Sequence, residues 1–250
     1  MTTMKEIAEK TGVSVSTVSL VLNKRDVGRV KPDIAQRVRQ TATDLGYTPN
    51  PLARSLRTSK TRILGFISEE VATTPYAGGI ILGAQDAAST YGYMLITVST
   101  DGQASEESEI AALKRYGVDG FFYSKMSNRI ATVPKSLSDY PVVLLDATDA
   151  NNTLPSVEPD EFQIAYDATS RLIEAGCERI AYVGCSENMI AQDGRLAGYR
   201  AALEGTDHGF DASLVCNVLN NGPALRAVDA LFNTCNPDGF FCFNDARTWY

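Results

Sequence analysis

The sequence predicts a small all-helical domain followed by a larger α/β domain, which contains two doubly wound parallel sheets. Two observations support this division. Short, capped amphipathic helices fill residues 1–46, whereas apolar strands alternate with amphipathic helices after residue 62. The charge also changes sign, because residues 1–62 hold 12 lysines and arginines against five acidic residues, whereas the remainder holds 11 against 25. We therefore expect a basic head on an acidic body.

The head begins with two predicted helices joined by a glycine turn. Thr3 caps a helix that begins at Met4, and Glu6 completes a capping box. Gly12 ends this helix in a left-handed turn, and Ser14 caps the next helix. The residues expected to face inward are Ile7, Ala8, Val18, Val21 and Leu22.

A third helix is predicted from Pro32 to Leu45, where Gly46 stops it. Its inward residues are expected to be Ile34, Val38, Ala42 and Leu45. The following segment contains two prolines and several basic residues, which indicates a linker. The predicted domains are therefore a helical head (1–48), a hinge (49–61) and a body (62–250).

The body shows strand–helix alternation with short connections. Strands are expected at 63–67, 93–98, 120–124, 142–146 and 179–184, and helices near 78–91, 105–116, 161–175 and 194–204. Two successive sheets, divided near residues 147–160, fit this pattern better than one long sheet. Parallel sheets bind ligands at the carboxyl ends of their strands. This rule marks Glu69, Ser124, Asp146 and Asn244.

Several classes of function find no support in the sequence. The five cysteines include no CxxC pair, and His208 is the only histidine, so we expect neither a metal site nor a disulfide framework. No nucleophile-elbow or phosphate-loop motif is present, so we expect no catalytic residue, no cofactor and no enzyme. The chain lacks a signal-peptide pattern and a run of 18 apolar residues, which favours the cytoplasm and no membrane contact.

The basic head suggests a polyanionic partner, and two short helices joined by a glycine turn place the second helix in the DNA major groove. The runs IAEKTGVSVSTVSLVLN, LGYTPNPLARSLR, DGRLAGYRAAL and FFCFND resemble the lactose/galactose repressor family of bacterial transcription regulators. The resemblance covers nearly the whole chain. It implies a nucleoid-associated homodimer that binds a pseudo-palindromic operator in double-stranded DNA. It also implies a body resembling periplasmic binding proteins, which takes a small-molecule effector, most favourably a sugar.

The resemblance implies which head residues contact DNA. Val15, Ser16 and Leu20 match the base-facing positions of the recognition helix. Phosphate-contacting positions are matched by Thr17, Ser19 and Asn23, and the DNA-binding set also includes Thr3 and Asn50. The family often places an arginine where this chain has Leu20, so the operator sequence stays open. The alternative is a plain helical bundle with Val15 and Leu20 in its core.

The linker resembles the family's hinge helix, which forms only when it is paired with its dimer mate on DNA. Leu56 would then wedge between base steps in the minor groove. Ala53 would permit close approach, and Arg54 and Arg57 would lie near phosphates. The alternative is a flexible tether.

The resemblance also implies roles in the body. Arg195 matches an arginine that holds an effector's hydroxyls or carboxylate. Tyr76 would stack on a sugar ring, and Asp146 and Asn244 would supply hydrogen-bond acceptors and donors. Alternatively, Asp146 caps the next turn, and Arg195 forms an ion pair at the surface.

The pattern of the family changes after FNDA, where this chain reads ARTWY instead of an apolar helix. We therefore expect a truncated second sheet with exposed edges. Two other classes of protein fit the sequence less well. A periplasmic solute-binding module would need a signal peptide and no basic head, and a sugar-modifying enzyme would need a base or metal cluster. Effector identity and the choice between induction and co-repression stay open.

Overall fold

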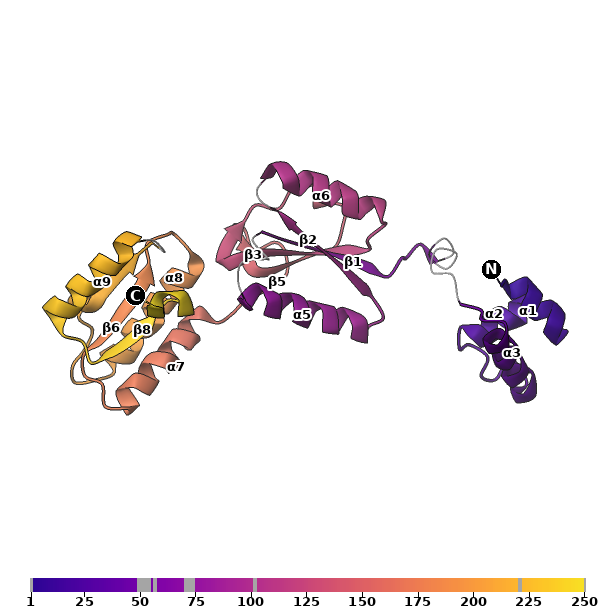
Figure 1. Ribbon diagram of the computed structural model, residues 1–250, viewed down its shortest axis with the longest axis horizontal. Coiled ribbons are helices and arrows are strands. Elements are labelled where there is room, and N and C mark those ends of the chain that lie inside the picture. Colours follow the sequence, from indigo (N-terminus) through magenta and orange to yellow (C-terminus); the bar gives the residue numbers. More distant parts are fainter. Residues whose placement is uncertain are drawn as a thin grey trace. The chain divides into compact units, whose positions relative to one another are not determined.

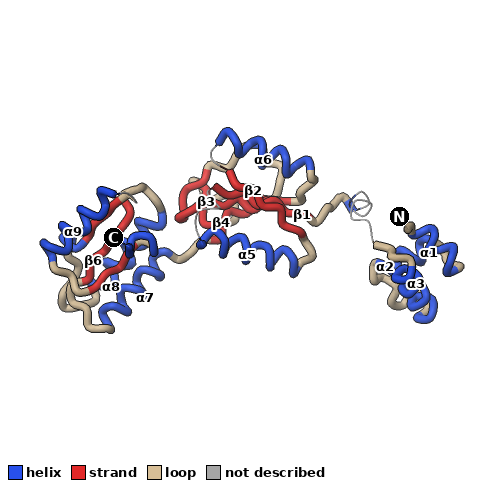
Figure 2. The backbone as a smooth tube through the Cα atoms, viewed as in Figure 1, coloured by secondary structure: helices blue, strands red, loops and turns tan. Residues whose placement is uncertain are grey.

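The computed structural model describes residues 2–48, 55, 58–69, 75–100, 103–219 and 222–249. Internal contacts divide the chain into two units, Met1–Thr61 and Arg62–Tyr250. Figure 1 traces the elements along the chain, and Figure 2 distinguishes the helical head from the α/β body.

The head contains three helices, α1 (Met4–Thr11), α2 (Val15–Leu22) and α3 (Pro32–Asp44). The capping box between Thr3 and Glu6 is present, Gly12 has a φ of 69°, and Ser14 accepts a hydrogen bond from the backbone of Thr17. Helix α3 ends one residue earlier than expected, with Leu45 as its C-cap. The buried core consists of Ile7, Ala8, Val18, Val21, Ala35, Val38 and Ala42. Ile34 and Leu45 are only partly buried against it, because Ala35 takes the inward position.

The first sheet of the body has five parallel strands in the order β2-β1-β3-β4-β5. The strands are β1 (Ile63–Glu69), β2 (Met94–Thr100), β3 (Gly120–Ala131), β4 (Val142–Asp149) and β5 (Ser156–Val157). Helices α5 (Pro75–Thr90) and α6 (Gln103–Arg115) cover opposite faces, and a short 3-10 helix, η1 (Lys135–Leu137), precedes β4 (Figure 1). On the α6 face, Ile110 and Leu113 pack with Phe121, Tyr123 and Leu144.

The second sheet has three parallel strands in the order β7-β6-β8. The strands are β6 (Ile180–Cys185), β7 (Val215–Val218) and β8 (Gly239–Cys242), and the helices are α7 (Glu161–Glu174), α8 (Ile190–Glu204) and α9 (Gly222–Cys235). Two 3-10 helices, η2 (Ala212–Leu214) and η3 (Asp245–Trp249), belong to the same half of the body. Ile180 and Tyr182 pack with α7 and α8, whereas Ala181 and Val183 pack with α9. Strand β6 is therefore buried on both faces, as its uninterrupted apolar run requires.

The structure corrects several expected boundaries. The division between the sheets does not begin at residue 147, because β4 continues to Asp149 and β5 still belongs to the first sheet. Helix α8 begins at Ile190, four residues before the expected start. No membrane-crossing length of apolar helix occurs in the described part of the chain.

Strand β3 carries an irregularity that shapes the later site. Ser124 pairs with Leu145, and the next pair is Arg129 with Ala147. Residues 125–128 of β3 therefore stand opposite the single residue Asp146 of β4, which makes an irregular bulge with more than one extra residue. We call residues 125–128 the β3 bulge.

Candidate nucleic-acid interface and effector site

The outward surface of α2 is separate from the head's core. Val15 is 45% exposed and Ser16 is exposed, whereas Val18 and Val21 are at most 1% exposed. Leu20 is half-buried and lies outside the buried core set. Val15 is therefore not a core residue of a helical bundle, and it stands free to contact a partner.

Short polar side chains hold both ends of α2. The Ser14 hydroxyl lies 2.8 Å from Ser16 Oγ and 2.9 Å from Thr17 Oγ1. At the other end, Asn23 Nδ2 donates to the carbonyl of Ser19 at 2.7 Å. Thr17 and Ser19 thus lie on α2, and Asn23 is its C-cap.

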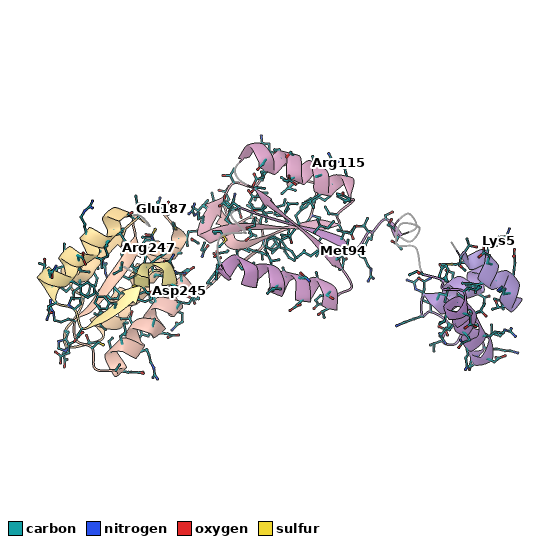
Figure 3. All side chains as sticks on the ribbon, viewed as in Figure 1. Lys5, Met94, Arg115, Glu187, Asp245 and Arg247 are labelled. Carbon is teal, nitrogen blue, oxygen red and sulfur yellow. The ribbon has the colours of Figure 1, made fainter. Side chains whose placement is uncertain are left out.

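The head presents its positive charge to solvent. Every lysine and arginine of residues 2–48 is exposed, including Lys5 on α1 (Figure 3). Arg39 also pairs with the buried Asp26 at 2.5 Å, which ties the α2–α3 loop to α3. A basic surface of this kind attracts polyanions. The expected hinge contacts Asn50, Ala53, Arg54, Leu56 and Arg57 lie outside the described residues.

In the body, Asp146 organises the β3 bulge. Its carboxylate accepts hydrogen bonds from the backbone N–H groups of Ser127 (2.8 Å) and Asn128 (3.1 Å). Asp146, Ser127 and Asn128 all have positive φ values, 52°, 68° and 43°. Left-handed conformations in non-glycine residues persist only where the surroundings hold them. Asp146 therefore stabilises the bulge on the neighbouring strand, and it does not merely cap the turn that follows it.

Asp146 is electrostatically coupled to three other side chains. Burial raises the pKa of Asp146 to about 6; the N–H groups of Ser127 and Asn128 and the charge of Arg195 oppose this rise, and Glu161 adds to it. Burial, Asp146 and Glu161 raise the pKa of Tyr76 to about 12, and Tyr76 also shares a side-chain hydrogen bond with Asp146. We call Tyr76, Asp146, Glu161 and Arg195 the Asp146 cluster.

The Asp146 carboxyl predicts a pH dependence of stability. Its folded pKa lies above the usual value of 3.8, so the folded state holds this proton more tightly than the unfolded state does. Ionisation of Asp146 therefore destabilises the folded state by about 3 kcal/mol. This cost is absent below about pH 4 and complete above about pH 6. The Asp146→Asn variant does not have this cost. Between pH 4 and pH 7, its unfolding free energy should therefore rise by about 3 kcal/mol relative to that of the parent protein. Urea unfolding of both proteins across this range measures it, and a constant difference would contradict the assignment.

Arg195 lies within a built network. Its Nε donates to Glu161 Oε2 at 2.6 Å, its Nη1 donates to the carbonyl of Phe243, and its guanidinium lies 4.5 Å from the centre of the Phe243 ring. The Arg195 side chain is 19% exposed and that of Glu161 is 5% exposed. Arg195 is therefore not a surface ion-pair residue.

The other expected effector residues are placed differently. Glu69 lines a separate polar cavity of about 310 Å³ on the α6 side, where its carboxylate lies 3.2 Å from Lys125 Nζ. Ser124 is only 3% exposed. Asn244 precedes η3, and its Oδ1 accepts a hydrogen bond from Arg247 at 3.1 Å.

A second, mostly apolar cavity of about 460 Å³ lies beside the Asp146 cluster. Tyr76 and Asp146 line it together with Phe122 and small residues of α5, including Gly83 and Ala84. This volume is in the range of small-molecule pockets. The structure therefore brings Tyr76, Asp146 and Arg195 into one neighbourhood, and Glu69 into another.

Sequence reasoning did not find Glu161, Asn128 or Arg247. Glu161 follows the N-cap of α7, where an acidic residue is typical for capping reasons alone. Asn128 belongs to the bulge, which has no hydrophobic pattern. Arg247 belongs to the ARTWY run that departs from the family pattern, and nothing in that run predicts that its side chain is only 5% exposed.

Both parts of the chain match models of known protein families. Residues 61–248 match the family model described as periplasmic binding proteins and sugar binding domain of LacI family, and residues 3–50 match that of bacterial regulatory proteins, lacI family. The chain is 35% identical over 218 residues to the HTH-type transcriptional regulator RegA of Clostridium saccharobutylicum, covering 86% of this chain and 64% of RegA. It therefore spans less than two thirds of that relative's length.

Solved structures agree in fold. The transcriptional regulator CelR–cellobiose complex has a TM-score of 0.59 and 26% identity, covering 97% of this chain and 74% of CelR. The lac repressor dimer bound to operator and an anti-inducer has a TM-score of 0.71 at 18% identity, covering 98% of this chain and 74% of that one, which supports the fold alone. With a helix-turn-helix head, two parallel sheets and both family models matched, the chain belongs to the LacI family of bacterial regulatory proteins.

Proposed function

We propose that this chain is a sequence-specific DNA-binding transcription regulator that acts as a repressor in the cytoplasm, where its DNA target lies. The observation that carries the proposal is the exposed surface of α2, where Val15 and Ser16 project from a basic head. A helix with this exposure fits the major groove, and its flanking polar residues suit phosphates. A homodimer would present two such helices to a pseudo-palindromic operator, and residues 49–61 would form its hinge.

We further propose that the body binds a small-molecule effector, most favourably a sugar, between its two sheets. The Asp146 cluster supports this, because Tyr76 and Asp146 come from the first sheet's half and Glu161 and Arg195 from the second. The family model's description as a sugar binding domain and the cellobiose complex of CelR support the same class. A ligand with different affinity for two states of the body would shift the population between those states.

Salt-dependent DNA binding tests the regulator. We expect the full chain to bind some genomic fragments roughly a thousandfold more tightly than the rest. The logarithm of affinity should fall with the logarithm of salt concentration at a slope of about −4 or steeper, which corresponds to about five neutralised phosphates. Fluorescence anisotropy between 50 and 200 mM KCl, about the range where counterion release is visible, measures both. Equal, weak binding to every fragment would contradict sequence-specific function.

A matched pair of variants locates the interface. Ser16→Ala should reduce the preference for the selected fragment by about 1–3 kcal/mol, the range for one base contact. Thr43→Ala removes an exposed hydroxyl from α3 and should leave the preference unchanged. Equal losses in both variants would place specificity outside α2.

A further inference from the structure

The polar cavity that Glu69 lines belongs to the first sheet's half of the body. Its volume is about 310 Å³, and its walls come from the carboxyl ends of β1 and β2, from β3 with its bulge, and from α6. Among the described residues, it shares no lining residue with the apolar cavity beside the Asp146 cluster. We call it the Glu69 cavity. Its volume lies at the lower end of the range of small-molecule pockets.

The buried end of the Glu69 cavity is rich in hydrogen-bond acceptors. Thr100 is 4% exposed and Glu106 is 7% exposed, and both line the cavity. Glu106 Oε1 accepts a hydrogen bond from the Tyr123 hydroxyl at 2.7 Å. Within the part of the chain that the structure describes, Glu106 Oε2, Glu69 Oε1 and the Thr100 hydroxyl have no hydrogen-bond partner. These three oxygens are therefore available to the donors of a ligand.

Two carboxylates share one cation at this buried end. Lys125 Nζ, in the β3 bulge, lies 3.2 Å from Glu69 Oε2 and 3.7 Å from Glu106 Oε1. The side chains of Glu69, Glu106 and Lys125 are 29%, 9% and 19% exposed. Two carboxylates and one ammonium leave a net charge of −1, in surroundings where water screens it less than at the surface. Largely buried negative charge of this kind favours a further cation.

The open end of the Glu69 cavity carries the opposite charge. Arg129, Ile130 and Thr132 line it, and all three are exposed. The ion-pair partner of Arg129 among the described residues is Glu187, at 4.0 Å, with the two side chains 44% and 53% exposed. An exposed ion pair of this length contributes little. The Arg129 guanidinium is therefore available to a carboxylate, which it can bind through two parallel hydrogen bonds.

We propose that the Glu69 cavity binds a small amino acid, with its ammonium group at the buried end and its carboxylate at Arg129. The charges of Glu69, Glu106, Lys125 and Arg129 sum to zero, but the carboxylates lie at the buried end and the guanidinium at the open end. A zwitterion matches this separation. Its ammonium supplies three donors, as many as the unpartnered oxygens of Glu69, Glu106 and Thr100. A ligand with a single charge would leave one end of the cavity unmatched.

This inference goes beyond the proposed effector, because it concerns another cavity and another class of ligand. A matched ligand panel tests it on the full chain. Isothermal titration calorimetry at pH 7.5 would compare glycine, β-alanine, γ-aminobutyrate and 5-aminovalerate, each with the amine that lacks its carboxylate and the acid that lacks its amine. We expect at least one amino acid to bind at least about tenfold more tightly than either matched compound, the effect of one charge-assisted hydrogen bond. Equal binding of the amine or the acid, or no binding of any amino acid, would overturn the proposal.

Variants of the charged residues assign the two ends of the ligand. Glu69→Gln keeps the shape of the side chain and removes one negative charge, so affinity for the amino acid should fall at least about tenfold. Arg129→Gln should weaken the amino acid until it binds no more tightly than its matched amine. Glu107→Gln and Arg115→Gln, at exposed positions of α6 outside the cavity, are the controls and should leave the affinity unchanged. Unchanged affinity in Arg129→Gln would overturn the proposed orientation.

A second pair of variants separates this cavity from the proposed effector site. Thr100→Val replaces the buried hydroxyl at nearly constant volume and should weaken amino-acid binding about fivefold. Tyr76→Phe alters the Asp146 cluster and should leave amino-acid binding unchanged. Equal losses in both variants would place the amino acid in the Asp146 cluster and overturn the inference.

The outcomes also distinguish this inference from the proposed function. If a sugar binds and no amino acid does, the inference fails and the effector-binding body stands. If an amino acid binds with the expected response to Arg129→Gln and no sugar binds, the sugar effector fails and the inference stands. Should Glu69→Gln not fold, the ligand panel and Arg129→Gln still decide.

Discussion

Replacing Gly198 with alanine should destabilise the body by about 3 kcal/mol, the upper part of the range for overpacked cores. Gly198 lies on α8 at its contact with α7. A Cβ atom there would stand 2.1 Å from the carbonyl oxygen of Phe162 and 2.9 Å from the backbone nitrogen of Tyr166. Both are backbone atoms of α7, so a side-chain rotation cannot relieve the clash. Either helix must move, and the Glu161–Arg195 pair that joins α7 to α8 would be disturbed as well.

Gly205 provides the control for this substitution. It is the C-cap of the same helix with an ordinary φ of −80°, and a Cβ atom there would lie 3.6 Å from its nearest neighbour. Gly205→Ala should change stability by less than about 0.5 kcal/mol. Urea unfolding followed by far-UV circular dichroism measures both, and the midpoint for Gly198→Ala should fall at an unchanged slope. Equal midpoints for the two variants would contradict the close approach of α7 and α8.

The periodicity of apolar residues was sufficient for most of the fold. The three head helices and strands β1 to β4 and β6 follow from patterns of 3.6 or 2 residues and from capping residues. Strands β5 and β7 did not follow, because Ser156–Val157 is too short for a pattern and Val215–Val218 includes a cysteine and an asparagine. The β3 bulge did not follow either, since its shape depends on the Asp146 carboxylate of another strand.

The candidate effector site was predictable only in part. Ligands of parallel sheets bind at the carboxyl ends of the strands, and this rule identifies one edge of the sheet. It does not say on which face of the sheet a side chain at that edge lies. Glu69 and Asp146 therefore line different cavities, although both end strands of one sheet. The pairing of Arg195 with Glu161 depends on how closely α7 approaches α8, which Gly194 and Gly198 permit. No local pattern in the sequence encodes such a pairing.

In the head, replacing Ile7 with alanine should weaken binding to every DNA fragment by unfolding the domain. Ile7 is fully buried and packs with Val18 and Val38, which are also fully buried. Removing most of a buried isoleucine side chain costs about 2–5 kcal/mol. A single core in a domain this small rarely supplies more than about 3–5 kcal/mol. The loss is therefore comparable to the head's whole stability, and at its upper end affinity for any DNA should fall by up to about thirtyfold.

Val15→Ala separates folding of the head from DNA recognition. Val15 is 45% exposed, so its truncation should leave the head folded and weaken only the preference for the selected fragment, by at most about 3 kcal/mol. Fluorescence anisotropy with selected and unrelated fragments distinguishes the two variants, because Ile7→Ala should lose both kinds of binding and Val15→Ala only the first. Limited proteolysis should cleave the head of Ile7→Ala and spare residues 62–250, which form a separate unit. Full DNA binding by Ile7→Ala would contradict the packing of α1 against α2 and α3, since no exposed residue of the head could replace the contacts that Ile7 makes in its core.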